Sequence, residues 1–435
     1  MGSPVDTIFA LSSGSPPAGV AVIRLSGPKA CEALQKLTLK ALPAPRVASL
    51  RRVFSQSGFL LDEVLVLLFR APHSFTGEDI VELHSHGSRA VVSALLGELE
   101  SMDGLRMAEA GEFSRRSFEH GRLDLVEVEG LAELISAETE MQRRLAVEQS
   151  FGGQSEIYNA WARRLTHARA MIEAELDFAD EDDVPGSVAE QIVDEIVTLH
   201  RALKEHVSAA GAGEIIRDGY KVAIVGPPNA GKSSLLNALA DRDVAIVTEV
   251  AGTTRDVISV DLDLEGFLVK LYDTAGLRES MDVVEQEGIR RARKLIEQAD
   301  LVLFLQEIGS STDQPFSAEG REIVRVGSKS DLRGASTEFD LCISVNSNLG
   351  ISDLRRLILE RVKAVWAGSA VPTRKRQLDL LQQASNFIEE ALKANVLELR
   401  AEYLRVAANS LGRITGAVDV EDLLDVIFSQ FCIGK

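Results

Sequence analysis

Short apolar runs separated by turn-forming residues dominate the first 118 residues. Four of these runs are predicted to be strands: Thr7–Leu11, Gly19–Leu25, Val64–Phe69 and Asp79–His84. Apolar residues at helical spacing predict helices over Pro28–Leu37, where proline suits the first turn, and over Ser88–Leu99. The mixture predicts a small α+β domain over residues 1–118.

From residue 119 the apolar positions follow helical spacing instead. Two stripes stand out before residue 213, at Ile157, Trp161, Leu165, Ala168, Ile172 and Leu176, and then at Ile192, Ile196, Leu199 and Leu203. A third follows residue 372, at Leu381, Ala384, Ile388 and Leu392. We predict one helical domain in two parts, 119–213 and 369–435, divided by an inserted unit at 214–368. Glycine-containing linkers at 211–213 and 368–372 would join the parts, and insertion is tolerated where the termini of the guest lie close together.

A buried strand, a glycine-rich loop and a helix follow one another at the start of the inserted unit. The loop Gly226–Ser233 matches G-x-x-x-x-G-K-[ST], the phosphate-binding loop or P-loop. Gly226 and Gly231 allow backbone N–H groups to point at a phosphate, and the helix N-terminus favours the same anion. Lys232 reaches the outer phosphates, and the Ser233 hydroxyl can bind Mg²⁺. The predicted phosphate site comprises Asn229, Ala230, Gly231, Lys232, Ser233 and Ser234.

Two polar loops after the P-loop match the switch loops of a GTPase. Thr254, in the first loop, is the candidate second Mg²⁺ ligand, in a segment ordered by the γ-phosphate. Asp273 follows an apolar strand and would hold Mg²⁺ through water, while the Gly276 N–H would sense the γ-phosphate. Further nucleotide contacts are predicted at Glu249, Ala251, Gly252, Thr274 and Ala275.

Two later segments are predicted to bind the base. Ser328–Asp331 lies where N-K-x-D is expected, so Lys329 and Asp331 are candidate base contacts. Asp331 can accept two hydrogen bonds from N1 and N2 of guanine, which adenine cannot supply. The last base-contacting loop is predicted at Ser344, Val345 and Asn346. Because Ser328 lacks the amide of the usual asparagine, we expect a lower affinity for the nucleotide and an unchanged preference for guanine.

Composition narrows the class of protein. The chain has 435 residues, a net charge of -19 and a pI near 4.9. This acidic balance argues against a protein that coats nucleic acid non-specifically. Its three cysteines, Cys31, Cys342 and Cys432, are far apart, so no disulfide framework is implied. No secretory signal and no apolar run near the ~20 residues that span a bilayer are visible. These features favour a soluble, cytoplasmic protein without a membrane partner.

The motifs together resemble one family. The P-loop segment, Gly252–Asp256 and Asp273–Arg278 are similar to the Era and EngA-like GTPases. Segments outside the GTPase unit resemble the MnmE (TrmE) family of tRNA modification GTPases: Phe75–Asp79, Gly111–Ser114, Leu123–Leu125 and Cys432–Lys435. The resemblance covers the whole chain. It implies a multidomain fold with an N-terminal folate-binding-like α+β domain and a helical domain divided by a P-loop GTPase domain.

The resemblance also implies a reaction. The family hydrolyses GTP, forms homodimers through the N-terminal domain and works in a heterotetramer with the FAD-containing protein MnmG. Together they add an aminomethyl or carboxymethylaminomethyl group to carbon 5 of the wobble uridine of certain tRNAs. The resemblance implies that the one-carbon unit comes from 5,10-methylene-tetrahydrofolate, with formyl-tetrahydrofolate as the alternative cofactor. By resemblance the folate site would use Arg24, Glu82, Arg122 and Lys435. For Arg24 and Glu82 the alternative is an ordinary ion pair.

The position that carries glutamine in Ras-like GTPases is Leu277 in this chain, and leucine cannot orient water. By resemblance Glu285 is the candidate, acting through a bridging water, and Glu279 and Asp282 are the alternatives in the same loop. Glu285 could equally be a carboxylate that a helix start favours. With Lys232 and Asp273, it completes the predicted catalytic set.

Asn229 in the P-loop suggests how the transferred phosphate is neutralised. By resemblance it helps to hold K⁺, together with carbonyls near Thr248, Val250 and Thr253. The alternatives are a hydrogen bond of Asn229 within its own loop, and an arginine finger from Arg255 or Arg278.

A second function remains to be weighed, an Era-like GTPase switch in ribosome assembly. Such a protein would carry a basic RNA-binding domain after the GTPase unit. Here the C-terminal part is helical, mixed in charge and ends in Cys432–Lys435, which favours tRNA modification.

Overall fold

The computed structural model describes residues 6–177, 188–240, 244–245, 258–273, 295–310, 321–366 and 371–418, and the positions 424, 427, 428, 431 and 434. Contacts divide the chain into two compact units, Met1–Ala132 with Gly412–Lys435, and Glu133–Leu411. Mixed α/β structure together with long helices confirms the coarse fold class. None of the described helices is long and apolar enough to cross a membrane. The predicted four-part division stays a prediction.

The first unit is built on a six-stranded sheet, ordered β3-β4-β5-β2-β1-β6. The strands are β1 Thr7–Leu11, β2 Ala18–Ser26, β3 Ser49–Phe54, β4 Leu60–Phe69, β5 Ile80–Gly87 and β6 Leu105–Met107. Neighbours are antiparallel except β1 and β6, which are parallel. The central pair, β2 and β5, places Arg24 directly opposite Glu82.

Helices α1 (Ala30–Thr38) and α2 (Arg89–Glu100) contribute buried apolar residues to the core of this sheet. Ser88 caps α2 by accepting a hydrogen bond from the Val91 N–H at 3.2 Å, as a helix N-terminus favours. Two further helices follow, α3 (Glu112–Glu119) and α4 (Leu125–Ser136). The buried Arg116 of α3 forms ion pairs with Asp6, Glu78 and Glu112, which compensate the burial of its charge.

Residues from the end of the sequence complete this first unit. Leu125 and Val128 of α4 share one apolar cluster with Leu424, Ile427, Phe428 and Phe431. Further on, the Ser12 hydroxyl donates a hydrogen bond to the Gly434 carbonyl at 2.8 Å. A Cβ at Gly434 would lie 2.2 Å from the Leu11 carbonyl oxygen, so only glycine fits there.

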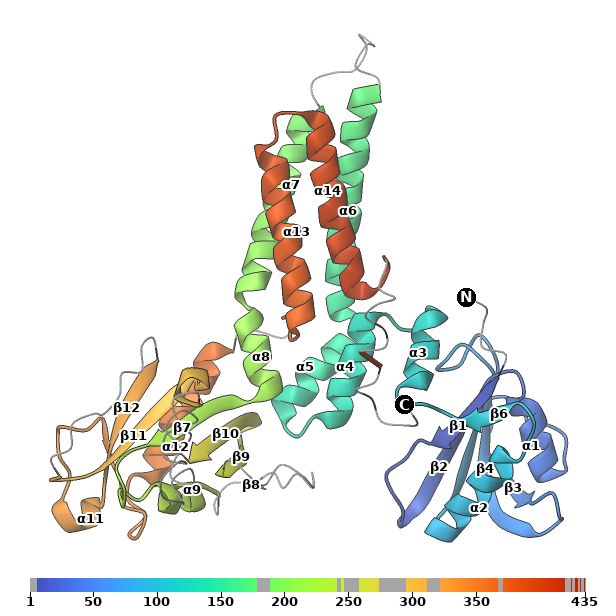
Figure 1. The fold of residues 1–435 in the computed structure, drawn as a ribbon, viewed down its shortest axis with the longest axis horizontal. Helices are drawn as coiled ribbons and strands as arrows, with labels where there is room; N and C mark the ends of the chain where they lie inside the picture. The colour runs from blue at the N-terminus through green and yellow to red at the C-terminus, as the bar shows by residue number, and fades with distance from the viewer. Residues whose placement is uncertain are drawn as a thin grey trace, which may run out of the picture. The chain divides into compact units, whose positions relative to one another are not determined.

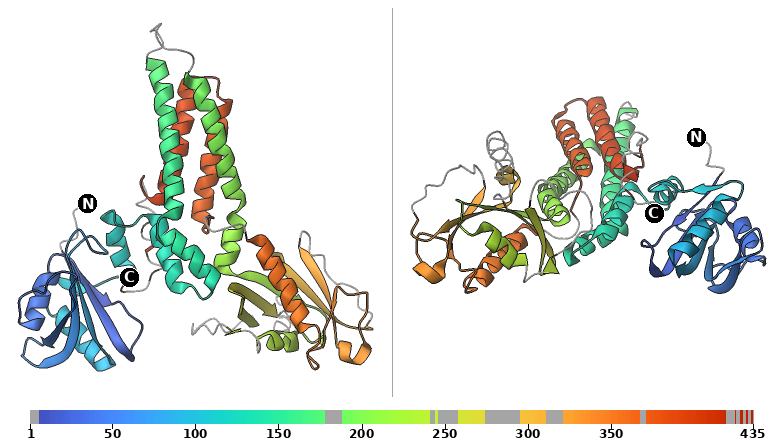
Figure 2. Two further views of the ribbon diagram at one scale, coloured as in Figure 1. Left: turned by 180° about the vertical axis from the view of Figure 1, so that it is seen from behind. Right: turned by 60° about the horizontal axis from the view of Figure 1, so that its bottom comes forward.

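The second unit contains a seven-stranded sheet, ordered β13-β12-β11-β7-β10-β9-β8 (Figure 1). Its strands are β7 Tyr220–Val225, β8 Val244–Ala245, β9 Ile258–Leu264, β10 Phe267–Asp273, β11 Leu301–Glu307, β12 Glu322–Ser328 and β13 Leu341–Cys342. Helices α9 (Lys232–Ala240) and α12 (Ile351–Val365) pack on the same sheet and share its main core (Figure 2, left). Strands β10, β7, β11, β12 and β13 are parallel, so their carboxyl ends meet at one edge.

The rest of this unit is helical. The helices are α5 Glu140–Ser150, α6 Gly153–Asp177, α7 Val188–Ser208, α8 Ala210–Asp218, α13 Lys375–Lys393 and most of α14 Leu397–Thr415. The long helices α6, α7, α13 and α14 lie side by side (Figures 1 and 2). The second predicted stripe is buried, and the other two are buried except at Ile157, Trp161, Leu176 and Leu392, which are half-buried. Leu165, Ile196 and Leu381 are each 2% exposed or less.

The predicted linker at 211–213 is wrong, because these residues lie inside helix α8. Gly213 serves close packing there, since a Cβ would lie 2.4 Å from the Pro372 carbonyl oxygen. Nearby, the Arg217 guanidinium donates to the Thr373 carbonyl, and the Gln149 amide donates to the Thr373 hydroxyl at 3.2 Å. The chain therefore leaves the helices for the sheet and returns from it at neighbouring points, as an inserted unit requires.

Candidate functional site

The P-loop connects the end of β7 to the start of α9. Gly226 lies so close to β11 that a Cβ would be 2.0 Å from the Leu305 carbonyl oxygen. Asn229 and Gly231 have positive φ angles of 61° and 97°, which turn the backbone around the site where an anion can bind. Helix α9 then begins at Lys232, and its first turn faces the same space.

Two side chains at the start of α9 are held in defined positions. Lys232 is buried, and its ammonium donates to the Gly226 and Pro227 carbonyls at 3.0 and 2.9 Å. The Ser233 hydroxyl donates to an Asp273 carboxylate oxygen at 2.6 Å. Asp273, the last residue of β10, is 1% exposed. A hydroxyl and a carboxylate at this distance form the start of an oxygen ligand set of the kind that Mg²⁺ prefers.

The candidate base-binding residues follow β12 and β13. Lys329 has a φ angle of 59°, and its ammonium lies 2.6 Å from Glu307 Oε2 at the end of β11. The Ser330 N–H donates to the Ile343 carbonyl at 3.1 Å, which ties the first base loop to the second. The buried Ser344 hydroxyl accepts from the Ser347 N–H at 3.2 Å and so fixes that second loop.

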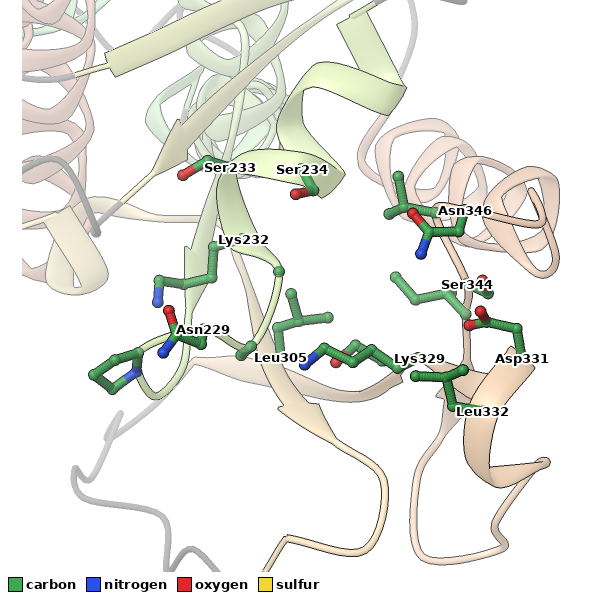
Figure 3. Close-up of a pocket in the computed structure, with 16 residues that line it drawn as sticks. Asn229, Lys232, Ser233, Ser234, Leu305, Lys329, Asp331, Leu332, Ser344 and Asn346 are labelled. Atoms are coloured by element: carbon green, nitrogen blue, oxygen red, sulfur yellow. The ribbon is translucent and has the colours of Figure 1, made fainter.

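The P-loop and both base loops line one cavity of about 700 Å³, within the range of ligand sites. Its lining includes every predicted P-loop contact, Asn229, Ala230, Gly231, Lys232, Ser233 and Ser234, and every predicted base contact, Lys329, Asp331, Ser344, Val345 and Asn346. Figure 3 shows Lys232 and Ser233 on one side, with Asp331 and Asn346 on the opposite side. The parallel sheet explains this grouping, because each of these loops follows a strand at the same edge.

A second candidate site lies in the first unit. The Arg24 guanidinium forms two contacts with Glu82 Oε1, at 2.9 and 3.0 Å, and both side chains are largely buried. The same guanidinium lies over the rings of Phe75 and Phe113, with centroid distances of 5.3 and 5.8 Å. Arg24 and Glu82 therefore form an ion pair against an aromatic wall on the face opposite α1 and α2. Arg122 is exposed, with its side chain beside Gly77.

Comparison with known proteins identifies the family. The model of the MnmE helical domain matches residues 125–432, and the model of the GTP-binding protein TrmE N-terminus matches residues 7–122. The tRNA modification GTPase MnmE of Sinorhizobium medicae is 59% identical over 437 residues, covering 99% of both chains. The chain belongs to the MnmE family of tRNA modification GTPases. The Agrobacterium fabrum member is 56% identical, again over 99% of both chains.

Family membership confirms the predicted resemblance and the GTPase assignment, while the individual site residues stay predictions. Several of them lie outside the described residues: Thr248, Glu249, Val250, Ala251, Gly252, Thr253, Thr254, Thr274, Ala275, Gly276, Glu285 and Lys435. The alternatives Glu279 and Asp282, and the finger candidates Arg255 and Arg278, also lie there. The described part of the candidate site therefore comprises the P-loop, Asp273 and the two base loops.

The structure also reveals neighbours that the sequence did not indicate. Glu307 holds Lys329, although no motif includes it. Phe75 and Phe113 surround Arg24, and both lie in segments already noted for their family resemblance. Ser328, which departs from the usual asparagine, is 5% exposed, and its hydroxyl has no hydrogen-bond partner among the described residues.

Proposed function

We propose that this member of the family binds GTP in the cavity between the P-loop and the two base loops, and hydrolyses it during modification of the tRNA wobble uridine. The single observation that supports this most is the meeting of both predicted groups of residues at one cavity. Phosphate would lie against the P-loop and the N-terminus of α9, and guanine against the loops that carry Asp331 and Asn346.

Base preference provides the test of this binding mode. The Asp331 carboxylate would accept from N1 and N2 of guanine, so Asp331→Asn should weaken GTP binding and favour XTP, which has an oxygen at C2. Nucleotide affinity is measured by titration with GTP, XTP and ATP. Asp353→Asn, an exposed aspartate on α12, is the control. Unchanged preference in Asp331→Asn would contradict the proposed orientation of the base.

Mg²⁺ would be held by Ser233 and Thr254, with Asp273 acting through water. The Ser233 and Asp273 oxygens already lie together, which fits a hard divalent cation. Bound there, Mg²⁺ would offset charge on the β- and γ-phosphates. The ammonium of Lys232 would turn from the loop carbonyls to the phosphate oxygens. Glu285 would orient the attacking water through a second water.

K⁺ would add a further positive charge beside the phosphates. Asn229 lines the cavity on the P-loop side and offers a side-chain oxygen, and the carbonyls near Thr248, Val250 and Thr253 would supply the rest. A monovalent cation there can take the place of an arginine finger.

The first unit would bind the folate that provides the one-carbon unit. Arg24 and Glu82 are placed as a pair beside two aromatic rings, a combination that suits a flat pterin with several hydrogen-bond donors. A carboxylate such as Glu82 accepts from such donors. Arg122 and Lys435 would bind the glutamate tail. This unit would thus be folate-binding-like, and it would also form the homodimer.

The complete reaction would need the FAD protein MnmG, in a heterotetramer, and tRNA in the cytoplasm. The product would carry an aminomethyl or carboxymethylaminomethyl group at carbon 5 of the wobble uridine. Mass spectrometry of tRNA nucleosides from a deletion strain tests it, with return of the full-length gene as the control. Unchanged wobble uridine modification in the deletion strain would contradict the proposal.

A further inference from the structure

The side chain of Lys329 is held by a residue outside the known nucleotide motifs. Its ammonium lies 2.6 Å from Glu307 Oε2, and the two side chains are 37% and 32% exposed. Glu307 is the last residue of β11 and lies opposite Ser328, the last residue of β12, in the parallel register. The pair therefore joins the ends of adjacent strands at the edge where the cavity opens.

The backbone conformation is defined at both residues of this ion pair. The Ile308 N–H donates to the Ser328 carbonyl at 3.2 Å. The Ser310 N–H and hydroxyl donate to the Glu307 carbonyl at 3.1 and 2.7 Å. On the other side, Lys329 has a φ angle of 59°. The backbone from which each side chain leaves is thus defined, by hydrogen bonds at Glu307 and by the φ angle at Lys329.

The two partners lie differently with respect to the cavity. Lys329 lines it, whereas Glu307 is not among its lining residues. In Figure 3 the Lys329 side chain runs toward Leu305 of the neighbouring strand. The charged end of Lys329 is therefore engaged by Glu307, while Lys329 itself lines the cavity.

An exposed ion pair of this kind contributes little to folding stability. The same hydrogen bond from the Lys329 ammonium lowers the pKa of the Glu307 carboxyl, with Arg333 adding a further positive charge nearby. The Glu307–Lys329 ion pair has a greater effect on ligand binding than on stability, because it orders the lysine side chain in advance. An unpaired lysine loses rotamer freedom when a ligand orders it. A lysine already held along the wall loses less.

We propose that Glu307 is a positioning residue for guanine nucleotides, holding the Lys329 ammonium so that its carbon chain forms an apolar wall for the base. The inference rests on the proposed function, because it requires GTP in this cavity.

The first test compares Glu307→Gln with the wild-type full-length protein, using a fluorescent GDP analogue. We expect affinity to fall roughly 3- to 10-fold, as loss of one preorganised side chain predicts, mainly through faster dissociation. The kcat at saturating GTP should not change, while KM should rise. The matched control is Glu322→Gln, which breaks an exposed ion pair with Arg361 at the opposite end of β12. Equal effects in the two variants would overturn the proposal.

A double-mutant cycle separates positioning from general disturbance. Lys329→Met keeps a long, unbranched apolar chain and removes the charge that Glu307 holds. In that background Glu307→Gln should have no further effect on affinity. Additive losses would show that Glu307 acts independently of Lys329 and would overturn the proposal. Wild-type affinity and KM in Glu307→Gln would do the same.

Failure of this inference can be told apart from failure of the proposed function. If wild-type protein binds GTP and Asp331→Asn shifts the preference to XTP, the cavity holds guanine as proposed. A silent Glu307→Gln would then overturn only the positioning role. If the wild-type protein does not bind GTP, or Asp331→Asn does not alter base preference, the proposed binding mode fails first.

Discussion

The Ser233 hydroxyl donates to a carboxylate oxygen of Asp273 at 2.6 Å, and this contact joins the start of α9 to the end of β10. Asp273 is also buried, at 1% exposure. A buried carboxylate needs a partner, and the Ser233 hydroxyl provides one. The same two oxygens are the ones predicted to hold Mg²⁺ directly and through water.

Asp273→Asn should reduce GTP hydrolysis strongly, because the variant keeps the shape of the side chain but loses the charge that supports Mg²⁺. We expect kcat to fall on the order of 100-fold, as for loss of one major electrostatic contact in an active site. Phosphate release at saturating GTP measures it, with Asp353→Asn as the exposed control. Full activity in Asp273→Asn would exclude it from the catalytic set.

Asn229→Ala should remove a selective response to K⁺. The wild-type protein should hydrolyse GTP faster in KCl than in NaCl at equal ionic strength, because K⁺ would be held beside the phosphates. The variant should lose this difference. Equal rates in the two salts for wild-type protein would rule out the ion site and direct attention to Arg255 and Arg278.

Glu285→Ala should slow hydrolysis while leaving GTP affinity nearly unchanged, since a group that orients water acts mainly in the transition state. Single-turnover hydrolysis and equilibrium binding, measured on the same protein, separate the two effects. Glu279→Ala and Asp282→Ala are the comparisons. If either of them is slow while Glu285→Ala is normal, Glu285 is the wrong residue.

Arg24→Ala should weaken binding of formyl-tetrahydrofolate and leave GTP turnover close to wild type, because the two sites lie in different units. Calorimetric titration measures the first and phosphate release the second. Arg52→Ala is the matched control, since Arg52 forms an exposed cross-strand ion pair with Glu63 on the same sheet. Wild-type folate affinity in Arg24→Ala would reject the assignment.

Ser328→Asn should tighten nucleotide binding. The present hydroxyl is buried without a hydrogen-bond partner among the described residues, and an amide offers both donors and an acceptor at that place. We expect slower release of bound GDP with an unchanged preference for guanine. Stopped-flow displacement of a fluorescent GDP analogue measures it. Faster release in Ser328→Asn would show that the pocket cannot accommodate the larger side chain.

The residues predicted to bind nucleotide line one cavity because their motifs follow the ends of parallel strands. Lys232, Lys329 and Asp331 are far apart along the chain, yet parallel strands bring their loops to one edge. The contact between Glu307 and Lys329 could not be predicted from the sequence, for a physical reason. Its contact depends on the register between β11 and β12, and no spacing rule fixes that register in advance.

A helix and a strand show where local patterns fail. Gly211 and Gly213 suggested a linker because glycine commonly ends helices, but tight packing against Pro372 keeps Gly213 within α8. Strand β3 was not predicted, because an edge strand needs apolar residues on only one face. Its Leu50 is 63% exposed and Val53 is buried, so alternation is incomplete. Tertiary contacts decided both cases.

The return of the last residues to the first unit has a consequence for biosynthesis. Leu125 and Val128 of α4 share their apolar cluster with Leu424, Ile427, Phe428 and Phe431. A ribosome makes these partners only after the whole second unit has been synthesised, while domains otherwise fold as they emerge. The apolar face of α4 therefore stays uncovered during most of translation, available to chaperones. The core of the first unit can therefore be completed only after the ribosome has made the last residues of the sequence, which include Gly434.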